Sequence, residues 1–209
     1  MFSKDHIAIL KKALRIIRKK EFNQYENYLR RGIIQPDKYG KTFNHFYDPT
    51  SNKGHWYFSN AKIQGTKHFK DAVKLYKKGK KRKAYFNLGK SLHYLTDLAI
   101  PAHSLPLIHL FCTDDLENYL KENLNEKIKI KNISPIRKKN VEDYFISIAK
   151  KSRKLKTKSN NFWISLKFRI LGKKEKLSKE ELKSQSKKVV KLAVSYSTGL
   201  LEKFYQEIN

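Results

Sequence analysis

Cysteine, glycine and proline are all scarce in this chain of 209 residues. The single cysteine, Cys112, excludes an intrachain disulfide and any zinc site built from several thiolates, so a bound metal would need histidine and carboxylate ligands. Eight glycines and five prolines argue against low-complexity sequence and against an all-β fold. No apolar run approaches the roughly 20 residues of a membrane span, and Lys and Arg interrupt residues 1–20 too often for a secretory signal. We therefore expect a soluble chain without an export signal.

Acidic residues are also few, because 19 Asp and Glu stand against 47 Lys and Arg and leave a formal net charge of +28. A surface this basic attracts phosphodiesters, either in nucleic acid through counterion release or in an anionic membrane surface. No helix-turn-helix, zinc-finger or RNA-binding pattern accompanies the charge. Lysines that merely solvate helix surfaces would account for it equally well. The charge alone leaves these three explanations open.

Apolar residues recur at helical spacing nearly throughout the chain, starting with Ile7, Leu10, Leu14 and Ile17 after a Ser3 cap. The spacing predicts that His6 faces inward from this first helix. Further helices are predicted at about 22–31, 66–78, 84–99, 114–127, 141–151, 162–171 and 178–208. We see no repeat and no convincing strand. The sequence therefore predicts an all-α fold, a single compact bundle of about six to eight helices over residues 1–209, which we expect to be a monomer.

One long segment, 32–65, interrupts the helical pattern. Its turn-forming residues are Pro36, Gly40, Pro49 and Gly54. A loop of this length in a compact domain usually has a function or is held in place by a ligand. The segment contains Asp37 and His45, a carboxylate and an imidazole. A bound metal is therefore a natural anchor for the loop.

A second candidate cluster lies in the segment 88–103, LGKSLHYLTDLAIPAH. His93 and Asp97 are four residues apart, so a helix places both on one face with Cβ atoms about 6 Å apart, where they can share a metal. Gly89, one turn earlier, leaves room above the helix for another group. Pro101 ends the helix and lets His103 turn back toward the pair. Without a metal, the same pattern would be a buried histidine beside a surface acid.

Four motifs together resemble those of the bacterial zinc-dependent phospholipases C. They are His6 near the start of the first helix, PD at 36–37, HFYDP at 45–49 and HYLTDLAIPAH at 93–103. This family includes the catalytic domain of clostridial alpha-toxin and the small Bacillus enzymes, and fungal single-strand nucleases are more distant relatives. The resemblance runs from about His6 to Glu117.

The resemblance implies a cleft that holds up to three zinc ions. The ligands of the first would be Asp37, His45, His93 and Asp97. Asp97 would bridge to a second zinc that His6 also binds, and a third would be held by His103 and Glu117. The implied reaction is hydrolysis of a phosphodiester, most readily a phospholipid headgroup, by attack of metal-bound hydroxide on phosphorus with Asp37 as a base. The alternatives are a single-strand nuclease and a catalytically impaired, zinc-stabilised helical module.

The chain departs from the family pattern at the third zinc. Family members have a histidine four residues before the final glutamate, where this chain has Thr113. His109, Cys112 or Asp114 could substitute for it. The family's mature N-terminus is a tryptophan whose amino group and carbonyl bind zinc, whereas this chain begins Met1-Phe2 and would have to use the amino group of Met1.

A further departure concerns the substrate. Choline-specific members carry an aromatic residue directly after the loop aspartate, and this chain has Lys38 there. A cation at that position would repel choline, so Lys38 is a candidate substrate contact that disfavours phosphatidylcholine. Family members are usually secreted. His55 and His68 match no family ligand, and we expect His55 on the loop surface and His68 solvated on a basic helix.

Overall fold

The structure, a computed structural model, describes residues 1, 3–39, 42–54, 59–104, 115–127, 129–155 and 177–209. Eight α-helices lie in these residues: α1 (Ser3–Ile17), α2 (Lys20–Gln24), α3 (Glu26–Ile33), α4 (Ala61–Lys77), α5 (Lys81–Asp97), α6 (Asp115–Lys127), α7 (Val141–Ser152) and α9 (Lys179–Ile208). Three short 3-10 helices are η1 (Pro36–Tyr39), η2 (Thr42–His45) and η3 (Pro101–Ser104). The described residues contain no strand, only an isolated bridge between Asp48 and Lys53. The predicted all-α bundle is confirmed.

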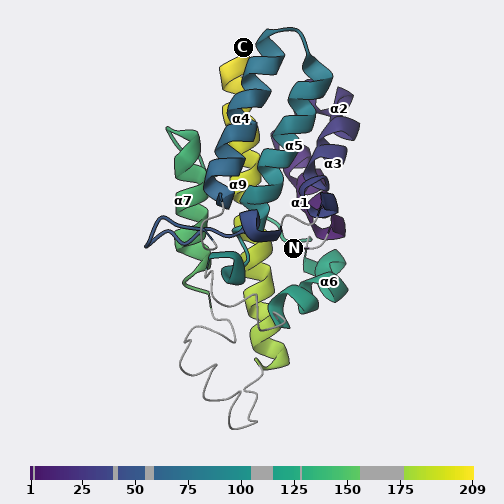
Figure 1. Ribbon diagram of the computed structural model, residues 1–209. Helices are drawn as coiled ribbons and strands as arrows, with labels where there is room; N and C mark the ends of the chain where they lie inside the picture. The colour runs from purple at the N-terminus through teal and green to yellow at the C-terminus, as the bar shows by residue number, and fades with distance from the viewer. Residues whose placement is uncertain (2, 40–41, 55–58, 105–114, 128, 156–176) are drawn as a thin grey trace.

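Helix α9 runs the length of the bundle and contacts α1, α4, α5, α6 and α7 (Figure 1). It begins with a capping box, in which the Ser178 hydroxyl accepts from the Glu181 amide and the Glu181 carboxylate accepts from the Ser178 amide. Helices α4 and α5 pack side by side as an antiparallel pair. Within the described part of the chain, no helix is both long and apolar enough to cross a membrane.

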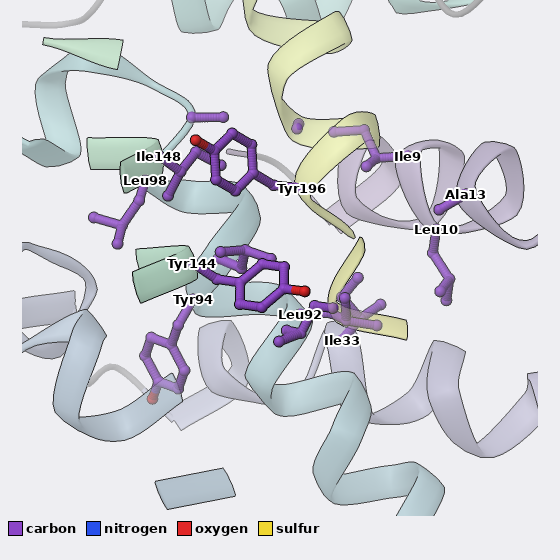
Figure 2. Packing of buried hydrophobic residues seen from close by; sticks show 14 of the residues in the cluster. Ile9, Leu10, Ala13, Ile33, Leu92, Tyr94, Leu98, Tyr144, Ile148 and Tyr196 are labelled. Carbon is purple, nitrogen blue, oxygen red and sulfur yellow. The ribbon is translucent and has the colours of Figure 1, made fainter. Parts of the chain in front are cut away.

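The core is built from the apolar stripes of these helices. Figure 2 shows part of it, with α1, α5, α7 and α9 contributing Ile9, Leu10, Ala13, Leu92, Tyr144, Ile148 and Tyr196. On α1, His6 lies on the same buried stripe as Ile9 and Ala13, and its side chain is fully buried. The prediction that His6 faces inward is confirmed. When the apolar face of a helix packs into the core, a polar residue on that same face is buried as well.

The predicted helix at 22–31 is two helices, because the chain leaves helical geometry at Tyr25 (φ −108°, ψ 14°). The Tyr25 ring stacks on the ring of Tyr85 from α5, with centroids 4.5 Å apart and planes 7° from parallel. This tertiary contact accompanies a break that sequence periodicity did not predict.

Two other helices start earlier than predicted. Helix α4 begins at Ala61 rather than residue 66, because the Asn60 side chain caps it by accepting a hydrogen bond of 3.0 Å from the Ile63 amide. Helix α5 begins at Lys81 rather than residue 84, directly after a turn in which Gly79 adopts φ 71°. The helix predicted at 162–171 and Asp114, the first residue of the helix predicted at 114–127, lie outside the described residues.

The close packing of α3 against α5 positions the site. A Cβ atom added to Gly89 would lie 2.9 Å from Gly32 Cα and would overlap the carbonyl oxygen of Leu29. The room above Gly89 that the sequence indicated is therefore filled by the backbone of α3. This contact brings the end of α3, and the loop that follows it, directly over His93.

Candidate metal centre

His93 and Asp97 lie in the last turns of α5, fully buried, with His93 Nε2 3.1 Å from Asp97 Oδ2. The other ring nitrogen, Nδ1, lies 2.7 Å from the carbonyl oxygen of Ile33 at the end of α3. Because a carbonyl can only accept, Nδ1 carries a proton, and Nε2 is the ring nitrogen that faces Asp97. The α3 contact thereby orients His93 for metal binding, as outer hydrogen bonds do at metal sites.

His6 reaches the same point from α1. Its Nδ1 lies 2.7 Å from the Thr96 hydroxyl, which itself lies 2.9 Å from the carbonyls of Leu92 and His93. The hydroxyl hydrogen goes to one of those carbonyls, so the Thr96 oxygen accepts from His6 Nδ1. Nε2 of His6 is buried, makes no hydrogen bond and lies 3.3 Å from Asp97 Oδ1. This nitrogen therefore presents its lone pair toward the Asp97 carboxylate.

The loop after α3 supplies His45 and Asp37. His45 Nδ1 lies 2.6 Å from Asp97 Oδ2 and 3.1 Å from His93 Nε2. Asp37, exposed on η1, places Oδ1 3.4 Å from His93 Nε2, while its Oδ2 accepts from the hydroxyl of Ser3 at 3.5 Å. Two backbone bonds hold this part of the loop, from the Tyr47 amide to the carbonyl of His103 (2.9 Å) and from the Ala61 amide to that of Phe46 (3.1 Å).

Two overlapping groups of metal-ligand atoms result. They are His6, Asp37 and His93, and His45, His93 and Asp97, and within each group the ligand atoms lie within 4.8 Å of one another. The five residues come from α1, α5 and the intervening loop. The expected convergence of the loop on the His93–Asp97 face is therefore present.

His103 and Glu117 meet at the amino group of Met1. This group lies 3.4 Å from His103 Nε2, 2.5 Å from Glu117 Oε1 and 3.2 Å from Asp97 Oδ1. His103 follows Pro101 on η3, and its ring stacks on that of Phe46 with centroids 5.2 Å apart. The second set of expected ligands thus adjoins the first, with Asp97 between them.

Charge and burial together set the protonation of the cluster. Burial disfavours ionisation of Asp97, but the Met1 amino group and His93 outweigh it and hold the pKa of Asp97 well below its usual range. Burial and the nearby His93 lower the pKa of His6 to about 3, so its ring is neutral. Partial burial of the Asp37 side chain, which is 32% exposed, and the charge of Asp97 raise the pKa of Asp37. Burial alone would lower the pKa of His93, but Asp97 and Asp37 outweigh it and raise that pKa, so a metal that binds this ring displaces a proton. Imidazoles and carboxylates at one point are the donor set that zinc accepts.

The structure places the remaining candidates around this cluster. Lys38 is exposed beside Asp37. Thr113, His109, Cys112, Asp114 and His55 lie outside the described residues. The expectation that His68 is solvated is wrong, because it is half-buried and its ring is nearly parallel to that of Tyr94, with centroids 6.0 Å apart.

Sequence reasoning missed two supports of the cluster. Tyr94 packs its ring against His45 and His93, with centroids 5.3 and 5.5 Å away. Thr96, described above, supports His6. A threonine three residues after a ligand histidine was a detectable signal, whereas the Ile33 carbonyl could not have been found without the packing of α3.

The sequence is similar to those of known proteins. The sequence model of the zinc dependent phospholipase C family matches residues 5–191. A phospholipase C of Listeria monocytogenes is 32% identical over 91 residues, which are 40% of this chain and 32% of that protein. A phospholipase C of Bacillus cereus is 35% identical over 97 residues, 43% of this chain and 34% of that protein. The matches thus span about a third of the length of these curated relatives.

Two solved structures share the fold over nearly all of this chain. The alpha toxin of Clostridium absonum has a TM-score of 0.75 at 18% identity, covering 98% of this chain and 64% of the toxin. An alpha-toxin of Clostridium perfringens from an avian strain has a TM-score of 0.71 at 17% identity, covering 99% of this chain and 62% of the toxin. At these identities the likeness concerns the fold alone.

Proposed function

Since the chain belongs to the zinc dependent phospholipase C family, we propose that it is a zinc-dependent phosphodiesterase that cleaves phospholipid headgroups. The observation that carries the proposal is the cluster itself, in which the unbonded Nε2 of His6 and the Nε2 of His93 point at one buried carboxylate, Asp97. We also take residues 1–209 to form one catalytic domain.

We assign the proposed ligands to as many as three zinc ions. Asp37, His45, His93 and Asp97 would hold the first. Asp97 would also serve the second, with His6, because its two oxygens face different neighbours: Oδ2 faces His45 and His93, and Oδ1 faces His6. His103 and Glu117 would hold the third, since both lie against the Met1 amino group, where a cationic group already fits.

Zinc bound here would acidify a coordinated water and stabilise negative charge on the phosphoryl oxygens. Asp37 would take the proton of the attacking water; in support of this role, its Oδ1 faces the cluster while its Oδ2 accepts from the Ser3 hydroxyl. The water oxygen would form a bond to phosphorus as the bond to the leaving oxygen breaks. His6 and His93 keep their protons on Nδ1, held by Thr96 and Ile33, and so offer only lone pairs to the site.

Lys38 is proposed as a substrate contact. It is exposed at the same edge as Asp37, where an ammonium group attracts the phosphate of a bound lipid and repels a quaternary ammonium headgroup. We therefore propose that anionic or neutral headgroups are preferred over choline. A wild-type preference for phosphatidylcholine that Lys38→Ala leaves unchanged would contradict this role.

The test incubates zinc-loaded protein with phospholipid vesicles of defined composition. Hydrolysis is measured as the release of diacylglycerol and the phosphorylated headgroup. Activity should track zinc content and be lost in His93→Ala, with His68→Ala as the control histidine outside the cluster. Lack of bound zinc in wild type and His93→Ala alike would contradict the proposal.

Two other results would assign a different function to the same site. The net charge of +28 favours a nucleic acid substrate, so single-stranded DNA is assayed in parallel, and its hydrolysis without lipid cleavage would identify a nuclease. Zinc-dependent thermal stability without turnover on either substrate would identify a catalytically impaired metal-binding module.

A further inference from the structure

A polar groove lies on the outer side of α1, lined by none of the candidate zinc ligands. It has a volume of about 450 Å³ and is lined by Lys11, Leu14, Arg15, Arg18, Asn23 and Glu26. The cations come from α1 and the residue that follows it, and the groove is closed by Asn23 of α2 and Glu26 of α3. Its volume is within the range of small-molecule sites.

The three cations form one stripe. Lys11 and Arg15 are four residues apart and share one face of α1, and Arg18, which directly follows the helix, lines the same groove. All three are exposed, and among the described residues no ion pair joins any of them to Glu26, the carboxylate that lines the same groove. Like charges at this spacing repel each other, so the stripe is unfavourable until an anion lies among them.

Stabilisation of the end of α1 accounts for only part of this arrangement. Cations in the last turn of a helix interact favourably with its carbonyls, which suits Arg15 and Arg18. Lys11 lies more than one turn before the end at Ile17, beyond the reach of that effect. The helix dipole therefore does not account for Lys11, which lines the groove together with the two arginines.

Arg18 also occupies a position that favours glycine. Its φ is 51°, in the left-handed region, while its amide donates to the Leu14 carbonyl at 3.1 Å and closes α1. Glycine adopts this conformation without steric cost. The chain has arginine here instead, with its guanidinium at the groove.

We propose that this groove binds a phosphorylated polyol. Guanidinium groups match phosphate oxygens in a two-pronged geometry, and Lys11 adds a point charge. Glu26 would repel a bare anion but accepts hydrogen bonds from hydroxyl groups, and Asn23 can donate or accept. A ligand with one phosphate and several hydroxyls satisfies both sides of the groove. Such a group is available as a soluble phosphate ester or as the headgroup of an anionic lipid, and the site does not depend on the proposed catalytic function.

The test is calorimetric titration of the zinc-loaded protein with sn-glycerol 3-phosphate, alongside sedimentation with phosphatidylcholine vesicles that contain or lack phosphatidylglycerol. A repeat of the vesicle measurement with chelator prevents headgroup hydrolysis. The double variant Arg15→Gln/Arg18→Gln should weaken binding by about tenfold with unchanged zinc content. The matched control Lys187→Gln/Lys188→Gln, on the exposed face of α9, removes the same charge and should change binding by less than about twofold.

A third variant separates binding from stability. Arg18→Gly removes the guanidinium and relieves the left-handed backbone, so its melting temperature should hold or rise while binding still weakens. Binding of glycerol 3-phosphate assigns the soluble ester, and binding only to phosphatidylglycerol vesicles assigns the lipid headgroup. Any of three results would overturn the proposal. Binding could be weakened equally in the groove and control variants, it could remain complete in Arg15→Gln/Arg18→Gln, or neither probe could bind saturably.

Discussion

Gly32 of α3 and Gly89 of α5 meet where the two helices are closest, so near that a Cβ on Gly89 would lie 2.9 Å from Gly32 Cα. The approach is needed because His93, one turn further along α5, donates from Nδ1 to the Ile33 carbonyl directly after Gly32. Packing of two backbones thus fixes which nitrogen of a candidate ligand is free to bind metal.

Gly89→Ala should therefore weaken both folding and metal binding. The added methyl group must displace the α3 backbone, and overpacking of this kind costs about 3 kcal/mol. Urea denaturation of the zinc-free protein checks the stability, and competition with a chromophoric chelator checks the zinc affinity. Gly79→Ala is the control: it strains a turn at φ 71° with open space around it, so it should lower stability by about 1 kcal/mol and leave zinc affinity unchanged. Equal zinc affinity in both variants would contradict the link.

Thr96→Val should lower zinc affinity without touching a ligand. The valine removes the acceptor of the His6 Nδ1 proton, and loss of such an outer hydrogen bond typically costs about 10–100-fold in metal affinity. The buried N–H left without a partner should also lower the stability of the zinc-free protein by about 1–3 kcal/mol.

The control for Thr96→Val is Thr198→Val on α9. Thr198 is equally buried and bonds back to the Val194 carbonyl at 2.9 Å in the same way, but it supports no histidine. Its replacement should leave zinc affinity within about twofold of wild type. If both threonine variants lost zinc to the same extent, the hydroxyl of Thr96 would have no specific role.

Some of the site could be predicted because helical geometry converts spacing into direction. A separation of four residues placed His93 and Asp97 on one face, and the apolar stripe of α1 carried His6 inward. What could not be predicted depends on tertiary contacts between distant segments. Neither the break at Tyr25 nor the Ile33 carbonyl has a local signal, since both arise where α2 and α3 pack on α5. His68 was misplaced for the same reason, because its partner Tyr94 lies on another helix.

Asp97→Asn and His103→Asn should differ in the amount of zinc they lose. One oxygen of Asp97 faces His45 and His93 and the other faces His6, so removing its charge should release two zinc ions per chain. His103 offers one nitrogen to the cluster, at the Met1 amino group, so its loss should release one. Elemental analysis of purified protein measures both. His68→Asn should keep the wild-type count, and equal losses in Asp97→Asn and His103→Asn would exclude bridging by Asp97.

Asp48 should stabilise the loop in a pH-dependent way. Burial opposes its ionisation, but hydrogen bonds from Thr50 and Ser51 and the charge of Arg153 hold the pKa of Asp48 below its usual value. A carboxylate with a lowered folded-state pKa contributes stability that is complete above its unfolded pKa of about 3.9 and is lost as pH falls through the folded value. Asp48→Asn should cost about 1–2 kcal/mol at pH 7. In zinc-free protein, the difference between wild type and variant should shrink as pH falls below about 3.9 and close below the lowered folded-state pKa of Asp48.

Zinc removal should open the loop after α3 before it unfolds the bundle. Bonds from Tyr47 to His103 and from Ala61 to Phe46, and the contacts of Arg153 with Asp48 and Thr50, tie the second half of this segment to the protein. The other contacts that anchor it are those of the candidate ligands Asp37 and His45 with α5. The bundle, by contrast, has its own apolar core along α9. Chelator should therefore leave the helical circular dichroism nearly unchanged.

Proteolysis reports on the loop directly. A lysine-specific protease should cleave after the exposed Lys38 and Lys53 at least about tenfold faster in chelator than in zinc, because local opening limits cleavage there. Lys187 and Lys188 on α9 serve as internal controls, since they are equally exposed but lie on a helix of the bundle. Cleavage at α9 that accelerates as much as cleavage at Lys38 would mean that zinc stabilises the whole fold. If zinc does not change the rate of cleavage in the loop, contacts within the protein alone hold the segment. The metal would then have no structural role in this site.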